Sequence, residues 1–148
     1  IKDHSYTISM WLNPTATSQY TTAFFGWATD SSWISVVPRG PGDAQNTMLW
    51  SGTAWFDGTF AKQIPVGTWS HLVMTVDNGK FTTYLNGVAT NTMTGYPDVF
   101  TPAATTQFAL GVNYWDIPYN GKVDELKIYD DVLTADDVSV VYGEGAPK

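Results

Sequence analysis

Apolar and polar residues alternate along most of the chain with a period close to two. In the segment 6–12, the side chains of Tyr6, Ile8, Met10 and Leu12 share one face. This alternation is typical of a β-strand with one buried face. Similar short runs, rich in Thr, Val, Ile and aromatic residues, follow at 20–28, 32–37, 47–51, 69–77, 80–86, 107–112 and 121–130. The pattern therefore predicts a chain made mostly of strands.

Turn-forming residues separate the predicted strands. They occur at 38–43, at Asp57-Gly58, at 77–79 and at Asn86-Gly87. The Asn-Gly pair at 78–79 supplies the positive φ angles that a tight hairpin turn between its neighbouring strands requires. About eight short strands joined by such turns indicate an all-β sandwich.

One helix is predicted near the end of the chain, over residues 135–142. Thr134 suits the N-cap position, and Asp137 suits the reciprocal position of a capping box. Val138 and Tyr142 then fall on one helical face. The acidic pairs in this region therefore have turn and cap roles rather than catalytic ones.

The composition is unusual in its aromatic content and its acidity. Aromatic residues make up 15% of the 148 residues, with seven Trp, whereas charged residues make up only 14%. The net charge of −7 argues against binding to nucleic acid or to anionic membranes, because both require clustered Lys and Arg. The lack of Cys excludes disulfides and thiolate metal sites, and no apolar run reaches the roughly 20 residues of a membrane span.

Four motifs, in sequence order, resemble one known family. They are the Thr-Ile-Ser-x-Trp strand at 6–14, the Trp69-x-His71 strand, the Tyr84-x-Asn86-Gly87 hairpin and the Gly121-x-x-Asp124-Glu125 strand that leads into the helix. In these motifs the chain resembles the laminin-G-like family of concanavalin A-type jelly rolls. The resemblance implies a jelly-roll β-sandwich of two antiparallel sheets with one short C-terminal helix near 135–142. The chain length fits a single domain of this kind over 1–142, and the composition of the tail at 143–148 is that of a linker.

The chain departs from this family at its N-terminus. Members usually have one or more further strands before the Thr-Ile-Ser-x-Trp element, whereas only residues 1–5 precede it here. We therefore expect the first strand of the family to be missing from this sequence. Its absence would expose a sheet edge and part of the core.

Glycoside hydrolysis is the enzymatic activity to consider for this fold, and it requires two carboxyl groups about 5–10 Å apart. The chain contains only two Glu: Glu125, which has no second Glu at a suitable spacing, and Glu144, which lies in the tail. His71 lies in a core-type strand without an evident nucleophile and base around it. We therefore expect no catalytic residues in this chain, which leaves a place within a larger glycoside hydrolase open.

Asp124 is the candidate for a structural metal ligand. Strict alternation places it on the same face as Leu126 and Ile128, so its carboxylate is expected to point inward. A buried carboxylate must be paired or bound to a metal. The family resemblance implies a structural Ca²⁺ held by an acidic residue of this strand and by backbone carbonyls, with Asp3 and Asp130 as candidate co-ligands. Calcium binding and simple hydrogen bonding are equal alternatives at this stage.

The aromatic surplus is the main functional clue. Trp11 and Trp69 match framework positions of the family, which leaves five Trp beside turn residues and small polar groups. Flat Trp and Tyr rings cover the C–H patches of sugars, while Asp, Asn and Arg side chains bond the hydroxyl groups. Large aromatics in loops often mark a binding patch. The predicted ligand-binding residues are Trp27, Asp30, Trp33, Arg39, Trp50, Trp55, Asn113, Tyr114, Trp115 and Asp116.

The sequence thus indicates a non-catalytic carbohydrate-binding module that holds a secreted or cell-surface protein, of bacterial type, on a polysaccharide. A neutral glycan is favoured, because Arg39 is the only Arg on a domain of net charge −7. Two alternatives remain: a protein-interaction or adhesion domain, and a structural accessory domain of a glycoside hydrolase. Neighbouring domains of a larger chain are expected partners, whereas nucleic acid and membranes are not.

Overall fold

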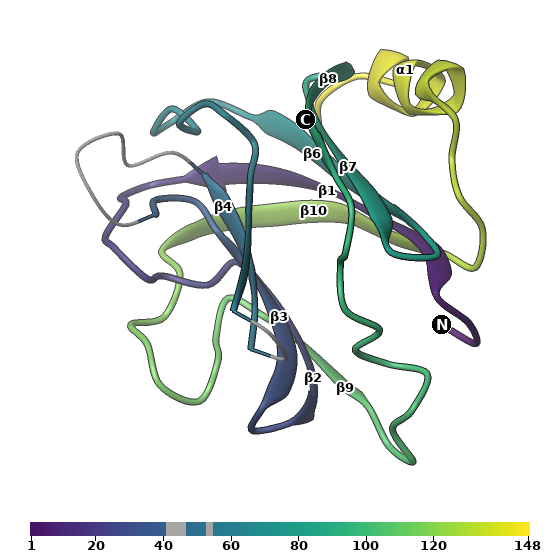
Figure 1. The fold of residues 1–148 in the computed structure, drawn as a ribbon. Coiled ribbons are helices and arrows are strands. Elements are labelled where there is room, and N and C mark those ends of the chain that lie inside the picture. Colours follow the sequence, from purple (N-terminus) through teal and green to yellow (C-terminus); the bar gives the residue numbers. More distant parts are fainter. Residues whose placement is uncertain (41–46, 53–54) are drawn as a thin grey trace.

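The computed structural model describes residues 1–40, 47–52 and 55–148, and it is a β-sandwich of two antiparallel sheets (Figure 1). The first sheet contains, in spatial order, β10 (Gly121–Tyr129), β1 (Ser5–Pro14), β6 (Ser70–Asp77), β7 (Lys80–Leu85) and β8 (Val88–Met93). The second contains β5 (Phe56–Thr59), β4 (Met48–Ser51), β3 (Ser32–Val37), β2 (Phe24–Thr29) and β9 (Gln107–Leu110). The predicted jelly-roll architecture of two antiparallel sheets is confirmed.

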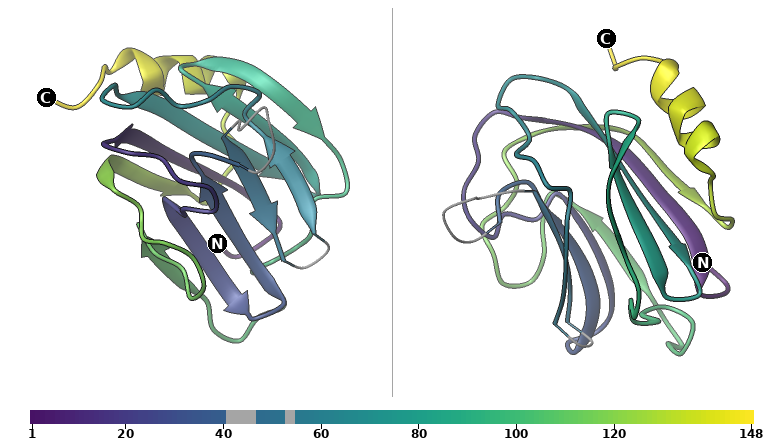
Figure 2. Two further views of the ribbon diagram at one scale, coloured as in Figure 1. Left: turned by 90° about the vertical axis from the view of Figure 1, so that its left-hand side faces the viewer. Right: turned by 45° about the horizontal axis from the view of Figure 1, so that its top comes forward.

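One helix, α1 (Ala135–Gly143), lies against the outer face of the first sheet (Figure 2). Thr134 Oγ1 accepts a hydrogen bond from the backbone N–H of Asp137, and the Asp137 carboxylate accepts one from the backbone N–H of Thr134. This reciprocal pair is the predicted capping box. The fully buried Val138 packs against Val73, which attaches the helix to the sheet. No helix in the described ranges is long and apolar enough to cross a membrane.

The core lies between the two sheets and consists of alternate residues of their strands. In β1 the inward-facing residues are Tyr6, Ile8, Met10 and Leu12, each at most 2% exposed, as the alternation predicts. Burial of each aliphatic side chain of this kind stabilises the fold by about 1.5–3 kcal/mol. The segment between β8 and β9 adds three buried residues that no alternation marks: Tyr96, Val99 and Phe100.

Two strands, β5 and β8, lie where the sequence predicts none. The Asp57-Gly58 pair, expected to form a turn, lies inside β5 instead. A Cβ on Gly58 would lie 2.5 Å from the Phe81 ring, so the glycine serves close packing between the sheets rather than a turn. β8 is an edge strand with polar residues on both faces, and it therefore shows no strand-like alternation. The predicted turn at 38–43 lies partly outside the described residues.

The inward orientation expected for Asp124 is wrong. β10 contains a bulge opposite residues 9–11 of β1, and Glu125 adopts a positive φ of 51° there. Because the bulge inserts one residue, Val123 and Leu126 both pack against the core. Asp124 is exposed, and its Oδ1 accepts a hydrogen bond from the Glu125 backbone N–H at 2.8 Å. Its carboxylate therefore needs no metal to compensate for burial.

The sandwich is less complete on the side where β9 and β10 form the sheet edges. Leu110 and Ile128 pair with the buried core residues Phe24 and Ile8, so they lie on the core side of their strands. Nevertheless Phe108, Leu110 and Ile128 are 42%, 47% and 38% exposed. β5 and β8 meet at the opposite side and close the core there. The core side of the sandwich is therefore partly uncovered along β9 and β10.

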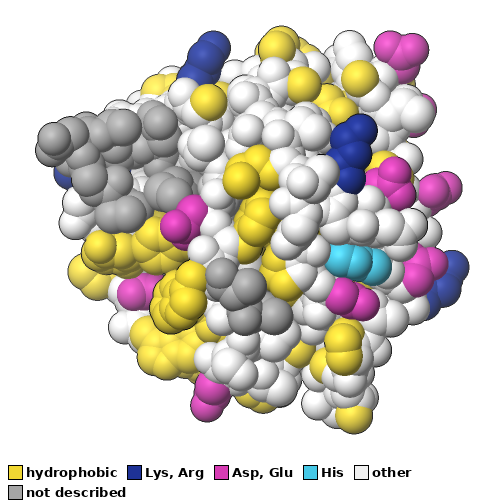
Figure 3. Space-filling view, viewed as in Figure 1, with side chains coloured by type: hydrophobic (Ala, Val, Ile, Leu, Met, Phe, Trp, Pro, Cys, Tyr) yellow, Lys and Arg dark blue, Asp and Glu magenta, His cyan; other side chains and the backbone are white. Residues whose placement is uncertain are grey.

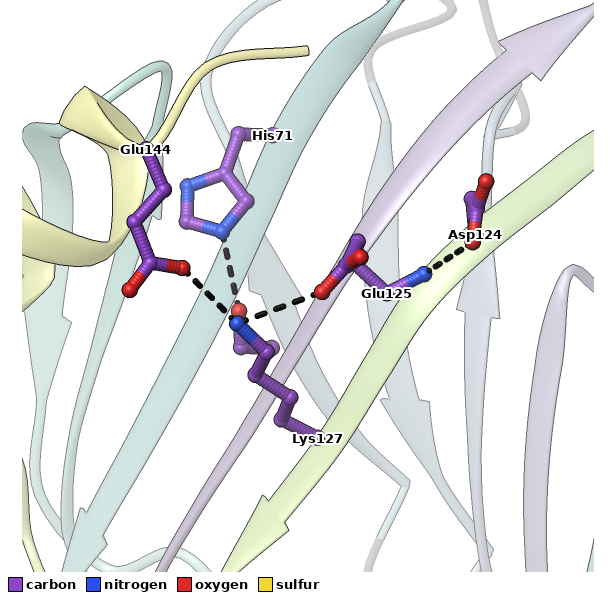
Figure 4. A network of polar contacts seen from close by, with 6 residues as sticks. His71, Asp124, Glu125, Lys127 and Glu144 are labelled. Atoms are coloured by element: carbon purple, nitrogen blue, oxygen red, sulfur yellow. Dashed lines mark hydrogen bonds and ion pairs between the residues drawn. The ribbon is translucent and has the colours of Figure 1, made fainter. Parts of the chain in front are cut away.

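A network of polar contacts (Figure 4) and a set of aromatic contacts also hold α1 on the first sheet. The His71 imidazole contacts the rings of Trp11 and Tyr142, at centroid distances of 4.9 and 5.9 Å. His71 Nε2 and Ser9 Oγ are hydrogen-bonded at 2.9 Å. The helix residue Tyr142 is in ring contact with Trp11 of β1 and with His71 of β6.

His71 is neutral at the base of this network. Burial, with a smaller contribution from the positive charge of Lys127, lowers the pKa of His71 to about 4. Lys127 is itself held between two carboxylates, with its Nζ 3.2 Å from Glu125 and 2.9 Å from Glu144 (Figure 4). Because the imidazole is only 1% exposed, it serves to attach the helix rather than to contact solvent.

This buried imidazole predicts a loss of stability as the pH falls from about 6.5 towards 4. In the unfolded chain His71 has its ordinary pKa, so below that pH the unfolded state binds a proton that the folded state excludes. The contribution is complete above about pH 6.5 and is lost as the pH approaches the folded pKa. We expect His71→Gln to reduce the loss of unfolding free energy between about pH 7 and about pH 4.5, measured by urea unfolding. An equal loss of unfolding free energy in the original protein and in His71→Gln would contradict this prediction. His4 is present in both proteins, so it does not contribute to the difference between them.

Candidate functional site

The outer face of the second sheet carries a row of aromatic side chains. Residues that alternate with the core residues of β2, β3 and β4 face outward, and they include Phe25, Trp27, Trp33 and Trp50. Antiparallel sheets commonly present polar residues on the face that does not contact the core. Figure 3 shows hydrophobic side chains gathered on the left of the molecule, the side on which this outer face lies. The face is therefore a candidate binding surface.

A groove with a volume of about 490 Å³ lies on this face. Trp33, Ser35 and Trp50, from β3 and β4, are part of its lining. The other lining residues come from the segments that join the strands: Asp30, Ser31, Gly52, Trp55, Trp115 and Asp116. We refer to these nine residues as the tryptophan groove. Its volume falls in the range of about 300–1,000 Å³ that is usual for small-molecule sites.

The Trp33 indole is the central ring of the tryptophan groove. It is only 8% exposed, and it packs so closely on the backbone that a Cβ at Gly52 would lie 2.1 Å from Trp33 Nε1. The Trp55 ring stands at 89° to Trp33 with a centroid distance of 6.1 Å, and the Trp115 ring lies 5.6 Å from Trp33. Trp55 and Trp115 are 73% and 53% exposed, so they offer open ring surfaces to a ligand.

Asn113 organises the loop between β9 and β10 that carries Trp115 and Asp116. Its Oδ1 accepts hydrogen bonds from the backbone N–H groups of Trp115 and Asp116, at 2.9 and 2.7 Å. Its Nδ2 donates to Thr22 Oγ1 at 2.9 Å and to the Asp116 carboxylate at 2.6 Å. These four bonds use the full capacity of the amide. Asn113 therefore positions the loop and has no bond left for a ligand.

Asp30 and Asp116 bring carboxylate oxygens to the groove. Asp30 Oδ1 accepts a hydrogen bond from Trp27 Nε1 at 3.2 Å, and Asp116 Oδ2 accepts one from Asn113. Within the described part of the chain, the second oxygen of each carboxylate has no partner. Each is free to accept a hydrogen bond from a ligand. Open aromatic rings beside such acceptors suit a molecule that is apolar on its faces and hydroxylated at its edges.

The structure brings six of the ten predicted binding residues into the tryptophan groove: Asp30, Trp33, Trp50, Trp55, Trp115 and Asp116. Three more line a smaller hollow beside it: Trp27, Asn113 and Tyr114. Arg39 lies apart, because it follows the end of β3 whereas Trp33 lies at the start, about 20 Å away along an extended strand. There Arg39 donates a hydrogen bond from Nη1 to the backbone carbonyl of Thr17 at 3.4 Å.

Three groove residues are absent from the predicted set: Ser31, Ser35 and Gly52. Alternation within β3 places Ser35 on the same face as Trp33, so this residue could have been found from the sequence. Gly52 carries no such signal, because its role depends on an indole from a different strand.

The three carboxylates expected to hold calcium do not gather. Asp130 pairs with Lys2, and Asp3 Oδ1 accepts a hydrogen bond from the Ser5 backbone N–H at 2.9 Å. Asp124 and Asp130 are separated by six residues of mostly extended chain, about 20 Å, whereas calcium ligands lie about 2.3–2.6 Å from the ion. Over the described ranges, no group of three or more His, Asp or Glu could hold a metal ion. These three residues do not fit one calcium site.

Metal removal tests whether calcium contributes in another way. Because the expected ligands are separated, we expect excess EDTA to leave the melting temperature unchanged, within about 1 °C. The measurement is a thermal unfolding scan with and without the chelator. A lower melting temperature in EDTA that added Ca²⁺ restores would instead show a site built largely from backbone carbonyls.

The contact between Trp33 and Gly52 predicts that this glycine tolerates no side chain. We expect Gly52→Ala to destabilise the protein by about 1–3 kcal/mol and to change the near-UV circular dichroism of the tryptophans, because Trp33 must move. Gly143→Ala is the matched control, since a Cβ at Gly143 meets nothing within 4 Å and its φ is not positive. Unchanged stability and spectrum in Gly52→Ala would contradict the prediction.

Comparisons with known proteins identify the family of this chain. A family model described as the concanavalin A-like lectin/glucanases superfamily matches residues 1–139. No curated protein matches the chain significantly. Among solved structures, domain 4 of AbnA, a GH43 extracellular arabinanase from Geobacillus stearothermophilus in complex with arabinotriose, is 45% identical to this chain. The match covers 96% of this chain and 68% of that chain, with a TM-score of 0.89.

Two more distant structures share the fold. The SAP-like pentraxin of Limulus polyphemus is 20% identical, over 94% of this chain and 70% of that chain, with a TM-score of 0.71. The CBM40 of the Ruminococcus gnavus IT-sialidase, bound to α2,3-sialyllactose, is 15% identical, over 96% and 84%, with a TM-score of 0.72. Since the family model spans nearly the whole chain, as the sequence motifs indicate, this protein belongs to the concanavalin A-like lectin/glucanases superfamily.

Proposed function

We propose that this chain is a non-catalytic carbohydrate-binding module whose tryptophan groove holds a neutral, arabinose-containing oligosaccharide. The observation that carries the proposal is the combination of open Trp rings with unpartnered carboxylate oxygens in one groove. The choice of sugar rests on domain 4 of AbnA, which is 45% identical to this chain and was solved with arabinotriose.

Stacking supplies most of the binding energy in this proposal. A sugar ring places its C–H face on the exposed rings of Trp55 and Trp115 and removes apolar surface from water. Its hydroxyl groups donate to the free oxygens of Asp30 and Asp116, so these carboxylates keep hydrogen-bond partners when the ligand displaces water. The bonds that Trp27 and Asn113 make to the two carboxylates hold them in place before binding.

The charge of the groove favours a neutral glycan. Among the described residues, Asp30 and Asp116 are the only charged ones that line it, and Arg39 lies elsewhere. An acidic sugar would place its carboxylate beside those of the groove on a chain whose net charge is already −7. A neutral pentose or hexose polymer meets no such repulsion.

We assign the groove carboxylates Asp30 and Asp116 to hydroxyl binding, and the two Glu residues supply no catalytic pair beside them. Glycosidases act through two carboxyl groups that flank the scissile bond. Both Glu125 and Glu144 pair with Lys127 on the outer face of the first sheet, across the sandwich from the tryptophan groove. The hydrogen-bonded pair of Ser9 and His71 is not accessible either, because each residue is only 1% exposed beneath the C-terminal segment.

The same comparison supports a place in a larger secreted enzyme. The matched structure is one domain of an extracellular arabinanase. We therefore propose that this module belongs to an extracellular, bacterial polysaccharide-degrading enzyme and keeps a neighbouring catalytic domain close to its polymer.

Titration with arabinotriose, followed by tryptophan fluorescence and calorimetry, tests the proposed function. We expect Trp55→Ala to weaken binding by about tenfold, because it removes one exposed stacking ring, whose ring contact among the described residues is with Trp33. Ile117→Ala is the matched control, since Ile117 is 64% exposed, lies in the same loop as Trp115 and does not line the groove. This control should bind like the original protein.

A panel of sugars then separates the alternatives. Neutral arabino-oligosaccharides should bind, whereas sialyllactose, which carries a carboxylate, should not. If the folded protein responds to no neutral glycan, the proposed function is wrong and a protein-interaction role becomes the better explanation. Equal binding of neutral and acidic sugars would contradict the role given to Asp30 and Asp116.

A further inference from the structure

A second hollow lies beside the tryptophan groove on the same face of the second sheet. Its volume is about 170 Å³, and its lining comes from β2, β9 and the loop between β9 and β10. Trp27, Gln107 and Tyr114 give it its aromatic and polar character. None of the residues that line this hollow is acidic, whereas Asp30 and Asp116 line the groove. The two hollows therefore offer different chemistry.

Two rings form a right-angled corner in the second hollow. The planes of Trp27 and Tyr114 meet at 90°, with a centroid distance of 5.8 Å. Tyr114 is 57% exposed, so one of its faces is available to a ligand. Trp27 is fixed by the hydrogen bond from its Nε1 to Asp30 at 3.2 Å. An immobilised aromatic corner of this kind takes the C–H face of a sugar with little loss of side-chain entropy.

The polar group of the second hollow is the amide of Gln107. Gln107 Oε1 accepts a hydrogen bond from the Tyr114 hydroxyl at 3.0 Å. This bond orients the amide and leaves its NH₂ group to donate to a ligand hydroxyl. Asn113 lines the same hollow, but its amide already makes four hydrogen bonds, to the loop and to Thr22, and can form no further hydrogen bond to a ligand. Gln107 is thus the hydrogen-bonding group that would contact a ligand, beside the rings of Trp27 and Tyr114.

Only a wall of aromatic rings separates the second hollow from the tryptophan groove. The adjacent rings of Tyr114 and Trp115 stand at 87° with centroids 5.8 Å apart, and each faces a different hollow. Phe25 lies behind the wall, with ring contacts to Tyr114 at 5.6 Å and to Trp33 at 6.2 Å. A single oligosaccharide chain that crosses this wall can therefore occupy both hollows.

We propose that the second hollow is a sugar subsite that takes a further unit, or a branch, of the neutral glycan bound in the tryptophan groove. The inference rests on the proposed function, because the groove must first hold the main part of the chain. The subsite adds a stacking surface on Tyr114 and a donor on Gln107 that a short ligand does not reach. The module thereby selects longer or branched chains over a single trisaccharide.

The test compares a short and a long ligand in the same variant. We expect the original protein to bind arabinohexaose more tightly than arabinotriose. Tyr114→Ala should remove most of this preference, weakening the hexaose by about five- to tenfold and the triose by less than about twofold. Gln107→Glu keeps the side-chain size and removes the NH₂ donor, so it should act in the same direction even if Tyr114→Ala fails to fold.

The outcomes separate this inference from the proposed function. If the original protein binds neither ligand, the proposed function itself fails. If it binds both and the variants weaken the triose as much as the hexaose, Tyr114 and Gln107 belong to the groove and the separate subsite is refuted. If neither ligand is affected in folded variants, the second hollow takes no sugar. Ile117→Ala should leave both affinities unchanged.

Discussion

The packing of the Trp33 indole on the backbone of Gly52 is the contact on which the rest of the site depends. A side chain at Gly52 would occupy the space of the indole, so β4 must carry a glycine where it leaves the sheet. With Trp33 fixed there, Trp55 and Trp115 have a rigid surface against which to pack. The exposed rings of the groove are thus held by a buried one, which keeps the cost of ordering them low when a ligand arrives.

The second sheet carries apolar side chains on both of its faces. In β3, Ile34 and Val36 enter the core, while Trp33 and Ser35 face the groove. An antiparallel sheet usually leaves the face away from the core to polar residues, and a large exposed apolar patch favours association. Here Asp30 and Asp116 lie among the aromatic rings, so that the patch suits a ligand with both C–H and O–H groups.

Local patterns determined most of what could be predicted from the sequence. The alternation at 6–12 and the capping box of Thr134 are set by neighbouring residues, and both appear in the structure. The expected positions of Arg39 and Asp124 differ from the structure for two reasons. Arg39 follows the far end of β3, and nearness in the sequence does not indicate at which end of a strand a residue lies. The bulge at Glu125 shifts the alternation of β10, so that Asp124 faces outward. Gly52 could not be found at all, since it meets Trp33 only through the pairing of two strands.

The first sheet explains why the candidate binding surface lies on the second. Its outer face is occupied by α1, which is attached by the ring contacts of Tyr142 with Trp11 and His71 and by the pairing of Lys127 with Glu144. On that face Ser9 is hydrogen-bonded to His71 and Lys127 pairs with Glu144, and the C-terminal segment lies beside both pairs. The inner faces of both sheets are buried in one core, and α1 covers the outer face of the first sheet. The aromatic outer face of the second sheet is therefore the broad surface on which a polymer can lie.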